Sequence, residues 1–284
     1  WGGKFDENFT DIFTVEDAIA NRVMEALTIR LVPEEKQLLS KRYTENSEAY
    51  QDYLQGHYHW NQRTETSLKK SIEFFTQAVT KDPEYALAFA GLSGAYALLG
   101  CVHGGVSPRE IIPSAREAAI RALELDNTLA EAHTALALVR GMYDWDWSAA
   151  IRCYEQALTL NPSSSAALHW YGLCLCWIGQ MDKGVTLLKQ ALRLDPLSPI
   201  ISANLAWAYF AKRDYQAALQ QCAEAIALEP KFYRAHVYAG WVQTQLGNVN
   251  EALQELRLAQ ELTGDGPEVT AIGYTLAVAG HGEA

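Results

Sequence analysis

The sequence has no long apolar run and no block of basic residues. None of its apolar stretches reaches the 18 or more residues that a membrane-spanning helix needs, and no basic start precedes an apolar segment as in a signal peptide. Lysine and arginine number 23 against 34 aspartates and glutamates, which gives a formal net charge of −11. Because affinity for a phosphate backbone depends on clustered basic residues, we expect this segment to bind no nucleic acid and to insert into no membrane.

Cysteine is scarce and does not follow a metal-binding or redox pattern. The chain contains five cysteines, an odd number, and no Cys-x-x-Cys pair. A disulfide framework is therefore not expected, and reduced thiols in the cytoplasm are the simpler interpretation. The alternative is an extracytoplasmic location, if a membrane-spanning segment precedes this part of the chain. The chain begins WGG without an initiator methionine, and we interpret it as a fragment of a larger protein.

What the sequence does contain is a repeated helical pattern. Segments of similar pattern end at Pro83, Pro162, Pro196 and Pro230, and the last three of these prolines are spaced 34 residues apart. A fifth segment ends at Asn127, and the intervals before and after it, 44 and 35 residues, contain insertions. Each segment has a small residue five positions before its end and apolar residues on one helix face, and the proline then stops the helix.

A second amphipathic stretch precedes each of these segments. Three such stretches end in a glycine, at Gly100, Gly179 and Gly247, where the left-handed backbone that closes a helix favours this residue. Each unit is thus a pair of helices joined by a turn. A single pair cannot bury its own apolar face, whereas stacked pairs build one core and a curved superhelix with a concave groove. We expect the first helix of each unit to line that groove and the second to face outward.

A helix–turn–helix unit of 34 residues with these small residues and terminal prolines resembles the tetratricopeptide repeat. The resemblance implies an all-α fold, a right-handed superhelix or α-solenoid, over residues 48–284. We count six repeats and a C-terminal capping helix within GPEVTAIGYTLAVAG. The predicted repeats span residues 50–83, 84–127, 128–162, 163–196, 197–230 and 231–264.

Residues 1–47 do not follow the period. A helix is predicted to begin near Thr14, to carry an apolar stripe from Val15 to Leu27, and to end before Pro33. We interpret this segment as the tail of a preceding domain followed by a linker helix.

Three stretches extend the resemblance to a bacterial regulator family. They are WGGKFDENFTDIFTVEDAIANRVMEAL, SEAYQDYLQGHYHWNQRT and YDWDWSAAIRCYEQALTLNP. In that family the repeats follow a small α/β domain similar to the amino-terminal domain of TolB-type proteins. A class III adenylate cyclase domain or a winged-helix DNA-binding domain commonly lies further upstream. The resemblance implies that residues 1–13 are the tail of the α/β domain.

Histidine and cysteine pairs in the chain have the wrong spacing for a metal site. Cys174 and Cys176 are two residues apart, which on an α-helix means about 200° of rotation, so their thiols cannot converge on one zinc ion. The same geometry applies to His57 and His59. His169 shares a helix face with Cys176, yet roughly 10 Å separates them along the axis. We therefore expect no metal and no cofactor, with the cysteines packed as small apolar residues.

Other stretches that look functional have structural explanations. GLSGA resembles part of a nucleophile elbow, which requires G-x-S-x-G, but Ser93 falls within a helix at the small-residue position and no His–Asp partnership accompanies it. We therefore predict that the chain is not an enzyme. In Met142–Ala150, Asp146 is the predicted N-cap of the following helix, with the two tryptophans packed structurally. The insertion Cys101–Glu110 is predicted to lengthen a surface loop.

The functional prediction concerns the groove. One position in the first helix of each repeat is predicted to face inward, and it holds Trp60, Leu173, Trp207 and Trp241 in four of the repeats. Large aromatics that recur along one wall beside arginine have the composition of a binding hot spot. The alternative for any one tryptophan is packing between helices. The predicted partner-binding residues are Trp60, Arg63, His169, Trp170, Trp177, Asn204, Trp207, Phe210, Arg234, Tyr238 and Trp241.

These residues predict a non-catalytic scaffold for protein–protein interaction that holds a peptide or protein segment in its groove. The regulator resemblance makes it the sensory or docking region of an adenylate cyclase or transcription regulator. Chaperone-binding members of the repeat family hold a terminal carboxylate with lysine, asparagine and arginine, but asparagine is absent from the inward positions of Trp60, Leu173, Trp207 and Trp241. The alternative function is self-association, in which a homodimer brings two effector domains together. Sedimentation over a range of concentrations discriminates between the two.

Overall fold

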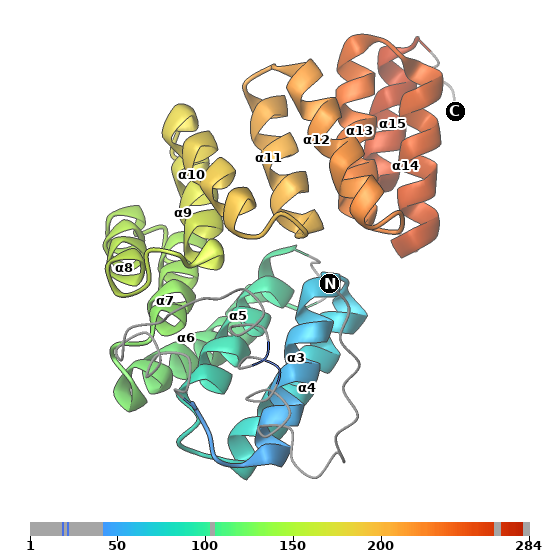
Figure 1. Cartoon of the computed structure of the whole chain (residues 1–284). Coiled ribbons are helices and arrows are strands. Elements are labelled where there is room, and N and C mark those ends of the chain that lie inside the picture. The colour runs from blue at the N-terminus through green and yellow to red at the C-terminus, as the bar shows by residue number, and fades with distance from the viewer. Residues whose placement is uncertain (1–18, 20–21, 23–41, 103–105, 264–267, 281–284) are drawn as a thin grey trace.

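The computed structural model describes residues 19, 22, 42–102, 106–263 and 268–280 (Figure 1). The helix predicted in residues 14–32 and the tail 1–13 thus lie outside the described residues, apart from residues 19 and 22. The helices of the array are α3 (Ser47–Gln62), α4 (Glu65–Lys81), α5 (Ala86–Val102), α6 (Pro108–Leu125), α7 (Ala130–Met142), α8 (Trp147–Leu160), α9 (Ser165–Trp177), α10 (Met181–Leu194), α11 (Pro199–Ala211), α12 (Tyr215–Leu228), α13 (Tyr233–Leu246), α14 (Val249–Thr263) and α15 (Glu268–Val278).

Successive helices pack as pairs, and the pairs stack into a curved array (Figure 1). Each odd-numbered helix contacts both its own partner and the odd-numbered helix of the next pair, as α5, α7, α9 and α11 do in turn. The odd-numbered helices therefore form the inner layer, and the even-numbered ones cover it from outside. The all-α solenoid predicted from the repeat is confirmed by this arrangement.

The helix boundaries follow from the residues that the repeat places there. Helix α8 ends at Leu160, two residues before Pro162, because the residue before a proline avoids the helical backbone and the proline has no N–H to donate. Gly179 and Gly247 close α9 and α13 with φ angles of 84° and 81°, the left-handed region that glycine tolerates best. Asp146 caps α8 as predicted, since its side chain accepts a hydrogen bond of 2.9 Å from the Ala149 amide.

One expectation about the second repeat is wrong, and a second one is incomplete. Gly100 does not cap a helix, because α5 continues to Val102. Gly100 instead allows a close approach: a Cβ atom there would lie 2.7 Å from Ile111 Cγ2 and 2.9 Å from the Tyr143 hydroxyl. The insertion does more than lengthen a loop, since α5 and α6 have 17 and 18 residues whereas α7 and α8 have 13 and 14. Residues 103–105 lie outside the described residues.

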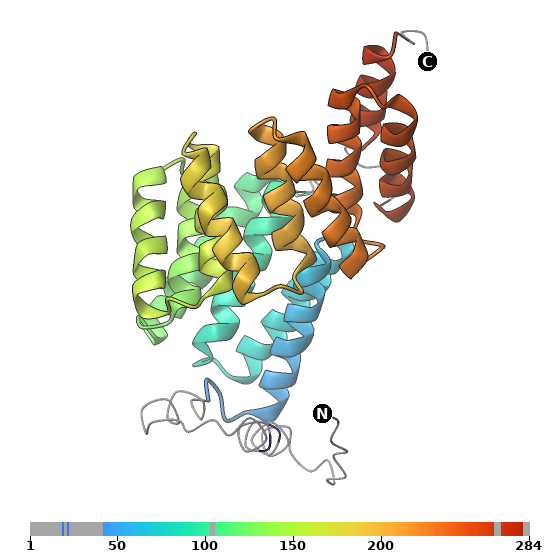
Figure 2. The same cartoon turned by 45° about the horizontal axis from the view of Figure 1, so that its top comes forward.

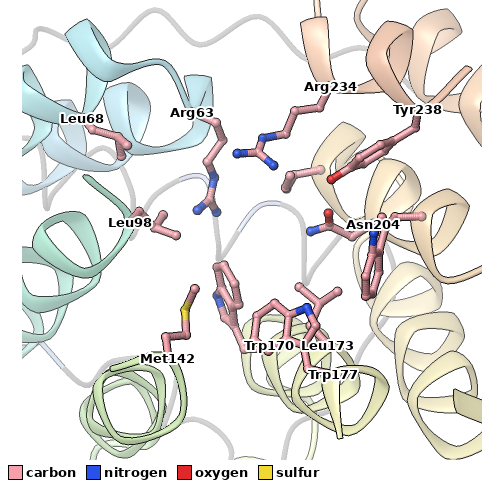
Figure 3. A pocket seen from close by; sticks show the side chains of 12 residues that line it. Arg63, Leu68, Leu98, Met142, Trp170, Leu173, Trp177, Asn204, Arg234 and Tyr238 are labelled. Atoms are coloured by element: carbon pink, nitrogen blue, oxygen red, sulfur yellow. The ribbon is translucent and has the colours of Figure 1, made fainter. Parts of the chain in front are cut away.

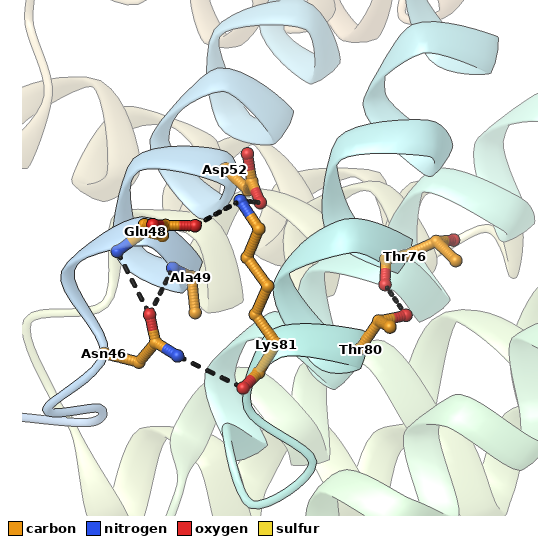
Figure 4. A network of polar contacts seen from close by, with 7 residues as sticks. All are labelled: Asn46, Glu48, Ala49, Asp52, Thr76, Thr80 and Lys81. Atoms are coloured by element: carbon orange, nitrogen blue, oxygen red, sulfur yellow. Dashed lines mark hydrogen bonds and ion pairs between the residues drawn. The ribbon is translucent and has the colours of Figure 1, made fainter.

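A network of polar contacts joins α3 and α4 at the start of the array (Figure 4). The Asn46 side chain accepts hydrogen bonds from the amides of Glu48 and Ala49 at 3.1 and 3.0 Å, which caps α3. Its amide group also donates to the Lys81 carbonyl at 3.1 Å. The Lys81 ammonium forms ion pairs with Asp52 at 2.8 Å and Glu48 at 3.4 Å. The beginning of α3 is thereby tied to the end of α4.

The curvature of the array brings its first and sixth pairs into contact. Arg63 follows α3 in the left-handed conformation, with a φ of 59°. Its carbonyl accepts a hydrogen bond of 3.4 Å from the hydroxyl of Tyr233, the first residue of α13. Figures 1 and 2 both show the end of α3, in blue, beside the α12–α13 region, in orange. The inner layer therefore closes around a centre instead of lining an open groove along this stretch.

Two glycines in the array make a matched test of inter-helix packing. A Cβ atom at Gly184 would lie 2.6 Å from the Gly172 carbonyl oxygen, so Gly184→Ala must push α10 away from α9. We expect it to lower the free energy of unfolding by about 2 kcal/mol. At Gly94 the nearest atom is Trp60 Nε1 at 3.6 Å, so Gly94→Ala fits, and its helix propensity raises stability by up to about 1 kcal/mol. Urea unfolding followed by circular dichroism measures both, and equal effects would contradict the packing described here.

Candidate functional site

A cavity of about 210 Å³ lies at the centre of the closed inner layer (Figure 3). The residues that line this central cavity come from α4, α5, α7, α9, α11 and α13 and from the residue that follows α3. One site thus collects side chains from six successive helix pairs. The lining residues are Arg63, Leu68, Leu98, Met142, Trp170, Leu173, Trp177, Ile200, Asn204, Trp207, Arg234 and Tyr238.

Most of the residues predicted from the groove pattern meet in this cavity. The seven that line it are Arg63, Trp170, Trp177, Asn204, Trp207, Arg234 and Tyr238. They lie on four different repeats, as far apart as 175 positions along the chain, yet the superhelix brings them to one place. Predicted groove residues from both ends of the array thus line one cavity.

The other four predicted residues lie around the central cavity. Trp60 supports Arg63 and lines a neighbouring pocket of about 80 Å³, to which Trp170 also contributes. His169 is buried next to the lining residue Asn204, and its Nε2 atom lies 2.7 Å from the Asn204 amide nitrogen. Phe210 and Trp241 pack against each other, with ring centroids 6.0 Å apart.

Several side chains that line the cavity are less exposed to solvent than the sequence predicted. The sequence predicted solvent-facing aromatics with nearby arginine, whereas Arg63, Trp170, Asn204 and Tyr238 are all less than a tenth exposed. Arg63 is buried where the residue after α3 meets Tyr233 of α13. Trp177 differs, because it stands at the rim of the cavity and is 38% exposed.

Arg63 is held in its buried position by indole rings. The carbon of its guanidinium group lies 3.4 Å from the centre of the Trp60 ring and 5.7 Å from the centre of the Trp170 ring. A cation above the face of an indole is attracted by the negative charge density of the ring, and this attraction grows when water is excluded. Trp60 belongs to the first pair and Trp170 to the fourth, so Arg63 links distant parts of the array.

The electrostatic environment of the cavity is positive. Arg63 and Arg234 are the charged groups among its described lining residues, which include no aspartate and no glutamate. The effect reaches the nearby histidines. Burial, and then the charge of Arg63, lower the pKa of His57 to about 4 and that of His169 to about 3. Both imidazoles are therefore neutral at pH 7, and the Nε2 of His169 accepts the hydrogen bond that the Asn204 amide donates.

The thiols of Cys174 and Cys176 pack as buried, unreactive groups. Cys174 and Cys176 are buried, and burial raises the pKa of each thiol to about 11, so both are protonated at neutral pH. Within the described ranges no three histidine, cysteine, aspartate or glutamate side chains gather as metal ligands. Among the helices that the structure describes, none is long and apolar enough to cross a membrane.

Sequence reasoning missed four apolar lining residues: Leu68, Leu98, Met142 and Ile200. Leu68 lies on α4, a helix of the outer layer, and it reaches the cavity only because the array closes. A repeat pattern reports how neighbouring pairs stack, and it carries no signal for contacts between the first pair and the sixth.

An aromatic edge leads outward from the rim of the cavity. Trp177 contacts Trp147 with ring centroids 6.4 Å apart, and Trp147 contacts Trp145 at 5.7 Å. Trp145 is 72% exposed and has a φ of 57°, a conformation that costs energy for a residue with a side chain. The turn is braced by two bonds of 2.8 and 2.5 Å between Arg116 and Asp144. The prediction of structural packing thus describes Trp147 better than Trp145.

His57 and His169 make the stability of the fold depend on pH. Their folded-state pKa values lie below the ordinary value of 6.5, so as pH falls below 6.5 the unfolded chain binds protons that the folded chain does not. The stability they contribute is present above pH 6.5 and is lost as pH falls. We expect His169→Gln to reduce the loss of stability between pH 7 and pH 5 by about 2 kcal/mol.

His236 provides a control of opposite sign. Burial lowers its pKa, but the Glu255 carboxylate 2.6 Å from Nδ1 and the Pro230 carbonyl outweigh burial, and the pKa is raised. Its contribution is complete below the unfolded pKa and is lost as pH rises, so His236→Gln should steepen the fall in stability toward pH 5. Urea unfolding at several pH values measures both variants, and a His169→Gln protein with the wild-type pH profile would contradict the assignment.

Comparison with known proteins identifies the repeat. Models of the tetratricopeptide repeat match residues 145–199, 178–231 and 209–272. The transcriptional regulator HilA of Salmonella typhimurium is 27% identical over 156 residues, which is 55% of this chain and 28% of that protein. Anaphase-promoting complex subunit 3 of Dictyostelium discoideum is 29% identical over 108 residues, 38% of this chain and 11% of that protein. This chain thus spans well under half the length of these relatives.

Solved structures share the fold at low sequence identity. The anaphase-promoting complex hetero-tetramer Cut9–Hcn1 has a TM-score of 0.62 at 16% identity, over 93% of this chain and 53% of that one. The type IV pilus biogenesis factor PilW has a TM-score of 0.56 at 16% identity, over 80% and 99%. A thermophilic tetratricopeptide-repeat protein of Thermus thermophilus has a TM-score of 0.54 at 21% identity, over 67% and 97%. Residues 145–272 therefore match tetratricopeptide repeats, and the fold of the chain is a tetratricopeptide-repeat superhelix.

Proposed function

We propose that the chain is a non-catalytic scaffold for protein–protein interaction, whose partner inserts a side chain of a peptide segment into the central cavity. The observation that carries this proposal is the convergence of seven predicted groove residues, from both ends of the array, on one cavity. Tetratricopeptide-repeat superhelices generally use their concave surface to bind other proteins. Tryptophan, tyrosine and arginine gathered at a desolvated centre are the residues that dominate binding energy at interfaces.

The cavity is large enough for one anchor side chain of a peptide and too small for a whole peptide. An apolar cavity of roughly 150 Å³ accommodates a benzene molecule, so about 210 Å³ suits a single aromatic or aliphatic side chain with its polar end. The remainder of the segment would lie along the aromatic edge formed by Trp177, Trp147 and Trp145. That edge offers exposed indole surface continuous with the rim of the cavity.

We further propose that this scaffold is the sensory or docking region of a bacterial regulator in the cytoplasm. The similarity to HilA, a transcriptional regulator, supports this role over 156 residues. In this arrangement residues 1–47 are a linker and residues 48–284 the repeat domain. The effector would be a winged-helix DNA-binding domain or an adenylate cyclase domain, with a TolB-like domain between.

Selection from a library of displayed random peptides tests the binding function. We expect the wild-type chain to enrich a motif with an apolar anchor residue. Trp177→Ala should weaken the selected peptide by roughly 30-fold, which corresponds to about 2 kcal/mol for a hot-spot residue. Trp177 is a suitable site because it lines the cavity and yet is partly exposed, so its loss disturbs packing less than that of Trp170.

Tyr58→Ala is the matched control, since Tyr58 is an exposed aromatic of α3 outside the residues that line the cavity. It should bind the peptide as the wild type does. Circular dichroism confirms that both variants are folded. The proposal fails if the wild-type chain enriches no motif, or if folded Trp177→Ala and Tyr58→Ala proteins bind the selected peptide equally well.

A further inference from the structure

The last helix of the array, α15, has the glycine spacing of an odd-numbered helix. Gly240 in α13 lies seven residues before Gly247, and Gly273 in α15 lies seven residues before Gly280. Gly247 and Gly280 have φ angles of 81° and 82°, the left-handed conformation that ends a helix. α15 also packs beside α13 and α14 at the C-terminal end of the array (Figure 1). It therefore corresponds to the first helix of a further pair.

In the complete pairs, this glycine allows the second helix to come close. A Cβ atom at Gly240 would lie 2.6 Å from Cγ of Leu256 in α14, and one at Gly172 would lie 2.9 Å from Cγ of Leu188 in α10. Carbon atoms in contact normally lie about 3.5–4.0 Å apart, so the leucine occupies the space that a side chain would need. At Gly273, in contrast, no atom of the described residues lies within 4 Å of such a Cβ. The corresponding place on α15 is open.

The open side of α15 is apolar. Thr275 defines the opposite, buried side, because its hydroxyl lies 2.8 Å from that of Thr244 in α13. No charged residue occurs in positions 269–280, whereas the terminal repeats of a solenoid need a polar outer surface where they face water. Tyr274 and Val278 are each 55% exposed. The exposed residues, which we call the α15 face, are Gly273, Tyr274, Ala277 and Val278.

The second helices of the array define the kind of helix that fits the α15 face. Both α10 and α14 present a small residue, a leucine four positions later and an alanine three positions after the leucine. Residues with this spacing lie on one side of a helix. The six residues are Gly184, Leu188 and Ala191 in α10 and Ala252, Leu256 and Ala259 in α14, and all of them are buried.

We propose that the α15 face docks an amphipathic helix of a partner protein that has this spacing of small residue, leucine and alanine. The leucine of the partner lies over Gly273, as Leu256 lies over Gly240, so the interface continues the packing of α13 on α14 by one more pair. A second copy of the chain is disfavoured, because Leu188 and Leu256 are fully buried within their own pairs. The α15 face is separate from the central cavity, which α15 does not line.

Selection from a library of displayed helical peptides tests this docking. Peptides of about 20 residues are long enough to form isolated helices. We expect the wild-type chain to enrich sequences in which a small residue, a leucine and an alanine have the spacing seen in α10 and α14. Replacement of that leucine by alanine in a selected peptide should weaken binding about tenfold, as fluorescence anisotropy measures. Selection without this spacing, or equal affinity of the two peptides, overturns the proposal.

Gly273→Leu fills the open place on α15. It should fold, because no described atom lies within 4 Å of the added Cβ and leucine favours the helix. We expect it to weaken the selected peptides about tenfold. Gln51→Leu adds the same side chain to an exposed position of α3 and should bind them as the wild type does. A folded Gly273→Leu protein with wild-type affinity contradicts the assignment, and if the variant does not fold, the two peptides still decide on the wild-type chain.

Two further measurements distinguish other occupants and the two proposals. A wild-type dimer in sedimentation equilibrium that Gly273→Leu converts to a monomer would replace the partner helix by a second copy and overturn the proposal. Selected helices that lose affinity with Trp177→Ala and keep it with Gly273→Leu bind at the central cavity, which supports the scaffold function alone. Helices that respond only to Gly273→Leu, on a chain that binds no peptide at the cavity, would refute peptide insertion there and support docking on α15.

Discussion

The contact between the first and sixth repeats determines what the centre of this molecule is. A stack of helix pairs gains its stability from neighbouring pairs alone, so its inner face is by default an open, solvated groove. Here the array curves until the carbonyl of Arg63 meets the hydroxyl of Tyr233. The inner face then surrounds a cavity with Trp177 exposed at its rim, and several of the side chains that line it are buried. The position of Arg63 beside Tyr233 depends on this contact.

The periodic part of the fold was predictable because each repeat imposes the same local constraints. Prolines such as Pro162 stop the second helices, Gly179 and Gly247 close first helices, and Asp146 caps a helix as its position indicated. The prediction failed at Gly100, where a glycine in the same apparent position lies inside a longer helix. Local sequence identifies a glycine that permits either a left-handed cap or a close contact, but only the packing of Ile111 and Tyr143 decides between them.

Some of the residues that line the cavity were predictable from the repeat, and the shape of the cavity was not. Counting inward positions within each repeat found Trp207 and Trp170, because the helical period fixes which residues face inward. That counting could not show that Arg63 and Arg234 would meet, since their meeting depends on curvature summed over five interfaces between repeats. For the same reason it missed Leu68, which belongs to an outer helix. Short-range periodicity therefore specifies the wall of the cavity, and long-range curvature specifies its closure.

Closure also explains how an acidic chain can keep a buried arginine without an acidic residue among the described residues that line the cavity. A guanidinium group loses hydration on burial, and the indole faces of Trp60 and Trp170 replace part of that stabilisation. Trp60 lies in the first repeat and Trp170 in the fourth, so this support exists only at one curvature of the array. Small rotations between neighbouring repeats add up along the chain. The geometry of the cavity therefore depends on the shape of the whole superhelix.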